Sequence, residues 1–413
     1  MALFSANVDA ALSQRREEAY EDVAFRLSPA LGLMNHKDSK GGNAIKVTVK
    51  NGYSAGVGGT YTTALTNVGE TQRQAFLVTP SVLYALETVD NTSELFSQGD
   101  DNAVIEIMSD AEKSCMSSAA LQVDQALFSD GYGTQFTILS NTGSGPYVLT
   151  ATNPTDLFKI QTNQVLASKA TPAAASLDTG TATVTNVNAI AGTVTVTANS
   201  GWTPTNTHVV GLSGTMLASA TISTFPGFKA WLTNDSTALA AAFFGVTRNV
   251  DPVGLAGHVI DLSATGTDII TATNTVIQSI SNFGKANPSL VFMNSTNYQK
   301  AMNLLDNRMR LTQSKGENIE VLYDGFSFVG PAGKPVTVHV ASACSPQDVF
   351  VLDPDTWHFA SPGNKFIRPG QPDGSSFIPA DFKNLDALLC KMRANGFIYC
   401  DAPGFNGRAI VAG

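Results

Sequence analysis

The chain has 413 residues, of which 43% are hydrophobic and 14% are charged, so it can bury two or three modest cores and is expected to be globular. A formal net charge of −9 counts against a protein that binds nucleic acid by neutralising phosphates. Residues 1–10 lack the basic and apolar regions of a secretion signal, and no run approaches the roughly 18 apolar residues of a membrane span. We therefore expect a protein that is made and assembled in a cytoplasm, without membrane contact.

The first eighty residues predict a helix followed by a two-stranded arm. Residues 8–25 place apolar side chains on one side of a helix and charged ones around the other. Residues 44–50 alternate between apolar and polar, as a half-buried strand requires, and Asn51-Gly52 ends the strand. A loose stretch leads to a second extended run, residues 72–79. Such a ribbon is marginally stable without a covering layer, so we expect it to lie on a neighbouring subunit.

The next segment predicts a helix of roughly thirty residues. Asp100, Asp101 or Asn102 can cap it, and Gly131 and Gly133 close it. Between them, apolar side chains recur at steps of three or four: Val104, Met108, Ala111, Cys115, Ala119, Val123 and Ala126. Because the mean helix has about 11 or 12 residues, we expect this one to act as a spine.

Residues 181–214 contain no charged side chain and are rich in Thr, Val, Asn, Gly and Ala. Residues 181–185 and 193–198 alternate as a hairpin around Ala191-Gly192, and residues 207–212 offer a third strand. This pattern predicts an inserted β module, residues 176–224. We expect it on an outer face, where a neutral β surface suits the docking of another protein.

From residue 225 onward, helical and extended patterns alternate, which predicts an α+β lobe and an α+β fold class overall. Residues 269–283 carry a helical apolar stripe, residues 290–293 a buried strand, residues 294–305 a capped helix and residues 336–340 an alternating strand. Residues 388–395 alternate again, which predicts a long strand that pairs back beside the spine.

The sequence contains no recognisable catalytic or metal-binding constellation. Four cysteines lie far apart without a CxxC pair, and five histidines lack ligand spacing, so we expect buried free thiols and no metal site. The runs at 56–59 and 211–214 match neither a phosphate loop nor a nucleophile elbow. We therefore expect no enzyme, no catalytic residues and no cofactor.

The candidate functional residues are instead cationic side chains that could make assembly contacts: Lys46, Lys50, Arg73, Arg308 and Arg310. The last two belong to a local basic excess with Lys300 and Lys315. This excess forms a solvated face, or it pairs across a subunit boundary with acidic groups such as Glu70, Glu87 and Glu94, which would set register more than affinity.

Short motifs in a fixed order carry a family resemblance. They are FPGFKAWL at 225–232, FFGV at 243–246, RNVDP at 248–252, VFMN at 291–294 and CDAPGFNGR at 400–408. Together with the order of arm, spine helix, α+β lobe and returning strand, they resemble major capsid proteins of tailed double-stranded DNA bacteriophages. That capsid fold is shared with encapsulins and with the floor of herpesvirus shells.

The resemblance implies an N-arm at 1–36, an extended loop at 37–79, a peripheral domain at 80–175 and 381–403, and an axial domain at 225–380 and 404–413. It implies hexamers and pentamers in an icosahedral virion shell that encloses double-stranded DNA without sequence-specific binding. Partners would be further copies of the chain, a separate scaffolding protein, a portal and a decoration protein. Some members crosslink a loop lysine to a neighbour, and Lys46 and Lys50 occupy that region, although loop lysines are more commonly solvated.

Three other interpretations stay open at this stage. An encapsulin-like compartment would have the same fold but hold enzymes instead of a genome. A secreted β-rich adhesin or surface-layer protein would suit the Thr, Val and Asn content but not the long helix. A hydrolase would need a constellation that the sequence does not display.

Overall fold

The computed structural model describes residues 29–38, 42–52, 55–90, 101–143, 145–199, 201–218, 222, 224–284, 286, 288–306, 327–329, 335–362, 367–370, 376–379 and 387–412. Within them the α+β fold class is confirmed, because long helices and three multi-stranded sheets or barrels coexist. The predicted helix at 8–25 lies outside the described residues.

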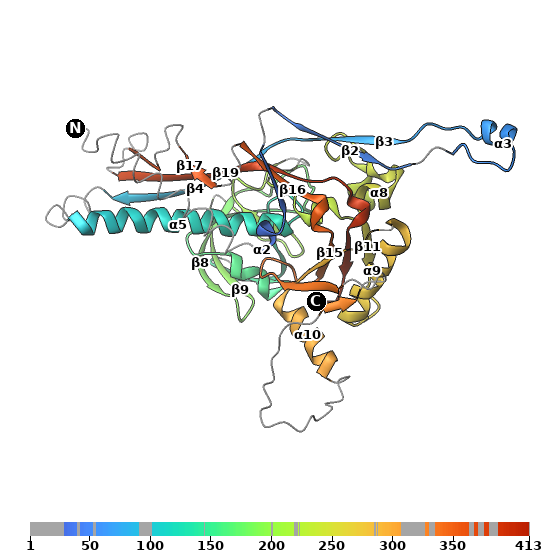
Figure 1. The fold of residues 1–413 in the computed structure, drawn as a ribbon. Coiled ribbons are helices and arrows are strands. Elements are labelled where there is room, and N and C mark those ends of the chain that lie inside the picture. The colour runs from blue at the N-terminus through green and yellow to red at the C-terminus, as the bar shows by residue number, and fades with distance from the viewer. Residues whose placement is uncertain are drawn as a thin grey trace, which may run out of the picture.

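The predicted spine is confirmed as α5 (Asp101–Phe128), a helix of 28 residues. It lies along a sheet in which β19 (Ala387–Cys400) pairs with β4 (Ser81–Asp90), as Figure 1 shows. Buried Met116, Ala119 and Val123 form the apolar side of α5 that covers this sheet. The sheet is completed by β1 (Asn35–Asp38), β16 (Trp357–Ser361), β17 (Ile367–Pro369) and β18 (Phe377–Pro379). We call this unit the peripheral sheet.

The β module is present but is larger than the expected residues 176–224. Six strands close into a barrel in the order β10-β5-β6-β9-β8-β7. They are β5 (Thr134–Thr142), β6 (Tyr147–Ala151), β7 (Val165–Lys169), β8 (Thr181–Asn188), β9 (Thr193–Asn199) and β10 (Val209–Leu212). The expected boundary is wrong because β10 pairs with both β5 and β7, so closure needs strands from residues assigned to the peripheral domain.

The third unit is a six-stranded sheet in the order β11-β20-β15-β12-β14-β13, covered by α9 (Ile269–Gly284) and joined to α10 (Ser295–Asp306). Its strands are β11 (His258–Asp261), β12 (Leu290–Met293), β13 (Ser327–Val329), β14 (Pro335–Val340), β15 (Asp348–Leu352) and β20 (Gly407–Ile410). The predicted elements at 269–283, 290–293, 294–305 and 336–340 are thus confirmed. Short helices α6 (Phe228–Trp231), α7 (Ser236–Ala240) and α8 (Pro252–Ala256) connect this lobe to the rest.

The four cysteines are buried and free, as predicted. In the part of the chain that the structure describes, no helix combines the length and apolar character needed to cross a membrane. Nor do the described residues include a group of three or more His, Cys, Asp or Glu side chains that could hold a metal ion.

Candidate subunit interface

The predicted arm is an antiparallel ribbon of β2 (Ile45–Lys50) and β3 (Arg73–Val78). Its Cα register runs from Ile45 opposite Val78 to Lys50 opposite Arg73. Beyond the strands the chain continues outward to a short helix, α3 (Tyr61–Thr66), which lies at the end of a long projection from the body (Figure 1). The arm therefore has a base on the body and a tip far from it.

The base of the arm is covered by its own chain. Val47, Val49, Phe76 and Val78 are buried, and the Phe76 ring lies 5.2 Å from the Trp231 ring. The expectation that the ribbon lacks a covering layer within its subunit is therefore wrong for the base. The motifs at 225–232 and 243–246 supply that layer through Trp231 and Phe243. In the sequence these motifs indicated only a family resemblance, not a contact with the arm.

Arg248 holds in place the aromatic side chains that cover the base of the arm, Trp231 and Phe243. Its guanidinium donates hydrogen bonds to the carbonyl oxygens of Ala230 at 2.8 Å and Trp231 at 3.1 Å, and lies 4.0 Å from the centre of the Phe243 ring. Burial lowers the pKa of Arg248 to about 10, so the side chain still carries its charge at neutral pH. The hydrogen bonds and the stacking together fix the position of the Phe243 ring relative to the α6 segment.

The tip is a folded unit with an apolar surface in water. The Thr60 hydroxyl caps α3 by accepting from the Thr63 amide at 3.3 Å, and the Asn67 side chain donates to the Val57 carbonyl at 3.1 Å. At Gly58 an added Cβ would lie 2.6 Å from the Ala64 nitrogen, so glycine is needed for the loop to press on the helix.

No residue of α3 is buried. Four large apolar side chains of the tip are mainly exposed: Val57 (76%), Tyr61 (82%), Leu65 (58%) and Val68 (65%). Such a cluster at the end of a projection is a candidate contact surface, because burying apolar surface contributes about 25 cal/mol for each Å² removed from water.

Three of the sequence-predicted contact residues share one face of the arm. Strand alternation exposes Lys46, Lys50 and Arg73 on the side opposite the buried base, and Lys50 lies directly across from Arg73. Like charges placed opposite each other weaken a ribbon slightly unless an acidic partner lies nearby. Arg308, Arg310 and Lys315 lie outside the described residues, while Lys300 is exposed on α10.

A second apolar surface lies on the peripheral sheet, on the side that α5 does not cover. Alternation along β4 turns Val82, Tyr84 and Leu86 outward, where they are 45%, 55% and 57% exposed. In register with them on β19 are Asn395, Arg393 and Lys391. We call these six residues the outer face. Sequence reasoning missed it, because β4 carries apolar residues on both sides and so has no period-two pattern.

The polar groups of the outer face are incompletely paired within the subunit. The Lys391 ammonium lies 5.2 Å from the centre of the Tyr84 ring. The Arg393 Nε and Asn395 Oδ1 atoms are buried and have no hydrogen-bond partner among the described residues. A buried polar group without a partner costs about 1–3 kcal/mol, so these two atoms lower the stability of the free subunit.

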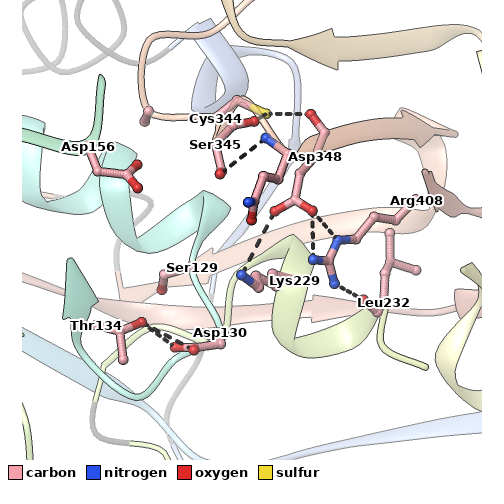
Figure 2. A network of polar contacts seen from close by, with 12 residues as sticks. Ser129, Asp130, Thr134, Asp156, Lys229, Leu232, Cys344, Ser345, Asp348 and Arg408 are labelled. Atoms are coloured by element: carbon pink, nitrogen blue, oxygen red, sulfur yellow. Dashed lines mark hydrogen bonds and ion pairs between the residues drawn. The ribbon is translucent and has the colours of Figure 1, made fainter. Parts of the chain in front are cut away.

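The body between arm and outer face is braced by a buried ion pair, shown in Figure 2. The Asp348 carboxylate accepts from Arg408 Nε at 2.7 Å and Nη2 at 2.6 Å, and Lys229 Nζ lies 3.9 Å away. Nearby lies a cavity of about 150 Å³ whose lining includes Asp130, Asp156 and Lys159. The ion pair joins strands β15 and β20, and Arg408 also donates to the Leu232 carbonyl oxygen after α6, so the arrangement serves rigidity.

The arm tip at α3 and the strand β4, which carries half of the outer face, lie on opposite sides of the body (Figure 1). The tip therefore cannot reach the outer face of its own subunit. A contact between them is possible only between copies, and such head-to-tail contacts close into rings when the rotation per subunit permits.

Comparisons with known proteins give structural similarity only. No protein-family model matches the sequence, and no curated protein matches it. The chain is similar to the capsid asymmetric unit of cyanophage A-1(L), with 12% identity, coverage of 93% of both chains and a TM-score of 0.49. It is also similar to the capsid of an empty GTA particle, with 9% identity, coverage of 93% of this chain and 96% of the other, and a TM-score of 0.40.

A third similar structure is the capsid of cyanophage P-SCSP1u, with 9% identity, coverage of 92% of this chain and 86% of the other, and a TM-score of 0.38. All three are structures of capsids.

Proposed function

We propose that the chain is a capsid shell subunit, a major capsid protein of the tailed-phage type that assembles with further copies of itself. One observation carries the proposal: an apolar tip on a projecting arm, and an apolar outer face on the opposite side of the body. Each surface lacks a partner within the described part of its own subunit, and head-to-tail pairing covers both. Repeated around an axis, this contact gives the hexamers and pentamers of a closed shell.

Charge supports the same pairing. Glu70 is exposed beside the tip, and Lys391 and Arg393 lie among the apolar residues of the outer face. Opposite charges beside an apolar contact fix its register and speed its formation. In the same way, Lys46, Lys50 and Arg73 on the arm would face acidic groups of a neighbouring copy.

The other expected partners belong to this proposal as well. The net charge of −9 suits a wall that encloses double-stranded DNA without holding it. The barrel, which begins at Thr134 and not near residue 176, would face outward and offer its neutral surface to a decoration protein. A scaffolding protein and a portal would take part in assembly inside the host cell.

The experiment that tests the proposal removes the apolar character of the tip without removing the arm. Changing Tyr61→Ser and Leu65→Ser together is expected to weaken each subunit contact by about 100-fold or more, since burying one such side chain contributes about 1.5–3 kcal/mol and 1.4 kcal/mol is tenfold. Shell yield would be measured by light scattering and negative-stain microscopy.

The matched control is Ile190→Ser, which replaces an apolar side chain that is 93% exposed at the far hairpin of the barrel. It removes one exposed apolar side chain outside the proposed contact, so shells should form as in the unmodified protein. Normal shells from the Tyr61/Leu65 variant would contradict the proposal, and so would an equal loss in both variants.

A further inference from the structure

The strand β4 has one edge that no described strand covers. Among the described residues β4 pairs with β19 alone, so its other edge ends the peripheral sheet. On β19, the Lys391 amide donates to the Ser376 carbonyl at 2.8 Å, and the Lys391 carbonyl accepts from the Gly370 amide at 2.7 Å. Both backbone groups of Lys391 therefore point away from β4. In an antiparallel pair the residue directly opposite, Leu86, then turns its own amide and carbonyl away from β19 as well.

Strand alternation extends this result along β4. Four residues turn their backbone amides and carbonyls toward the free edge: Val82, Tyr84, Leu86 and Thr88. These groups have no backbone hydrogen-bond partner within the described part of the chain. The four side chains are exposed as well. A row of unpaired amides and carbonyls of this length can bind a further strand.

The edge is open and lacks the usual protection against pairing. A groove of about 340 Å³ runs beside it, bordered by β4, by the side of α5 that carries Ser114 and Ser118, and by the 3-10 turn at Pro154–Lys159. Natural sheets protect a free edge with charges, prolines or bulges. From Ser81 to Leu86, β4 has no charge and no proline, and its register with β19 has no shift. Such an edge is expected to be paired in the assembled protein.

We propose that the free edge of β4 pairs with β4 of a second copy of the chain, antiparallel and about a two-fold axis, so that two peripheral sheets become one. The axis passes beside Ala85. This register sets Tyr84 opposite Leu86 of the other copy, and Val82 opposite Thr88 of the other copy. All the outward amides and carbonyls of these residues then gain partners on both strands.

Charge and proline select this register over its neighbours. Centring the pair on Leu86 would place the two Glu87 side chains diagonally across from each other, about 7–8 Å apart. In the proposed register they lie roughly 13 Å apart along the strands. Centring the pair on Tyr84 would set Thr88 opposite Pro80, which has no amide hydrogen. The strand therefore complements itself best in one register, as a two-fold contact requires.

The pairing adds a contact that the arm does not provide. A head-to-tail contact between arm tip and outer face uses both of its surfaces when a ring closes, so joining rings needs a contact of another kind. A two-fold contact at the rim of a ring meets this need, and it continues the outer face into the next subunit, with Tyr84 beside Leu86 of the other copy. This role as a joint between rings rests on the proposed function, whereas the pairing itself does not.

Crosslinking between two variants tests the pairing. One full-length preparation carries Val82→Cys and the other Thr88→Cys, while the four native cysteines are buried. The two are mixed at high subunit concentration and treated with a mild oxidant. Covalent dimers should form in the mixture and not in either preparation alone, because the register sets position 82 opposite position 88 and away from its own copy. Equal linking in the separate preparations, or no linking in the mixture, would overturn the proposal.

Hydrogen exchange on the linked dimer shows whether the strands are paired or merely close. In free subunits the amides of Tyr84 and Leu86 should exchange quickly and those of Leu83 and Ala85 slowly. In the dimer the first two should slow by at least about tenfold. Slow exchange at Tyr84 and Leu86 in free subunits, or fast exchange in the dimer, would contradict the pairing.

The same preparations separate this inference from the proposed function. Closed shells that contain no link between positions 82 and 88 would overturn the pairing and leave the shell proposal intact. Linked dimers from a chain that never forms shells would overturn the shell proposal and leave the pairing intact.

Discussion

Deleting residues 53–70 is expected to abolish closed shells while the rest of the subunit stays folded. The deletion removes the whole tip and leaves Gly52-Thr71 as a two-residue hairpin loop, with glycine first as a type II′ turn requires. The pairing of Lys50 with Arg73 is kept, and so is the buried base around Phe76. Since every subunit would lose the contact that its arm provides, the effect exceeds that of any single substitution.

Two measurements separate a loss of assembly from a loss of folding. Near-ultraviolet circular dichroism and the urea midpoint of unassembled variant subunits should match those of the unmodified chain. The reason is that no side chain of α3 is buried, so removing the tip leaves the core unchanged. Light scattering should show unassembled subunits without rings or shells. A normal yield of closed shells from this variant would contradict the role given to the arm.

Replacing Asp348 by alanine is expected to destabilise the subunit by about 3–5 kcal/mol, because it leaves the Arg408 guanidinium buried without its carboxylate. Asp348 is 2% exposed and Arg408 is 6% exposed, so the unpaired charge would stay shielded from bulk solvent. The measurement is the urea midpoint of unassembled subunits, which should fall without a change in slope.

A double variant shows whether the loss comes from the unpaired charge. Asp348→Leu together with Arg408→Met replaces the pair by apolar side chains of similar size and should recover most of the stability. If the double variant is as unstable as Asp348→Ala alone, the unpaired charge of Arg408 would not be the cause of the loss.

Much of the fold was predictable because local patterns agree with tertiary structure. The apolar steps from Ala111 to Ala126 predicted α5, since one side of that helix is buried against the peripheral sheet. The alternation at 44–50 predicted β2, since one side of the ribbon is covered and the other exposed. In segments with one buried and one exposed side, the order of apolar and polar residues indicates both the type of element and its buried side.

Elements with apolar residues on both sides, or with polar ones throughout, escaped prediction. The strand β4 has Leu83 and Ala85 toward the helix and Tyr84 and Leu86 toward the outer face, so its sequence does not alternate. In the barrel, β5 and β7 become strands through closure with β10, which no local window reveals. The helix α3 contains three threonines, and its only strong helix formers are Ala64 and Leu65, so it depends on the Thr60 cap.

For the same reason, the sequence predicted the charged residues of the candidate interface but not its apolar ones. The cations Lys46, Lys50 and Arg73 could be named from their place in an alternating arm, and the structure shows them on one face. The apolar tip and the outer face could not, because an exposed Tyr61 or Tyr84 looks like a core residue until its surroundings are known. The exposure of apolar side chains is a property of the fold and not of the local sequence.

Electron microscopy of the purified full-length chain tests the central proposal most directly. The account predicts closed particles built from hexamers and pentamers, with each arm tip against the outer face of the next subunit. A preparation that contains only folded monomers under conditions that range from low to high salt, or closed particles in which the tips of the arms remain in solvent, would contradict it.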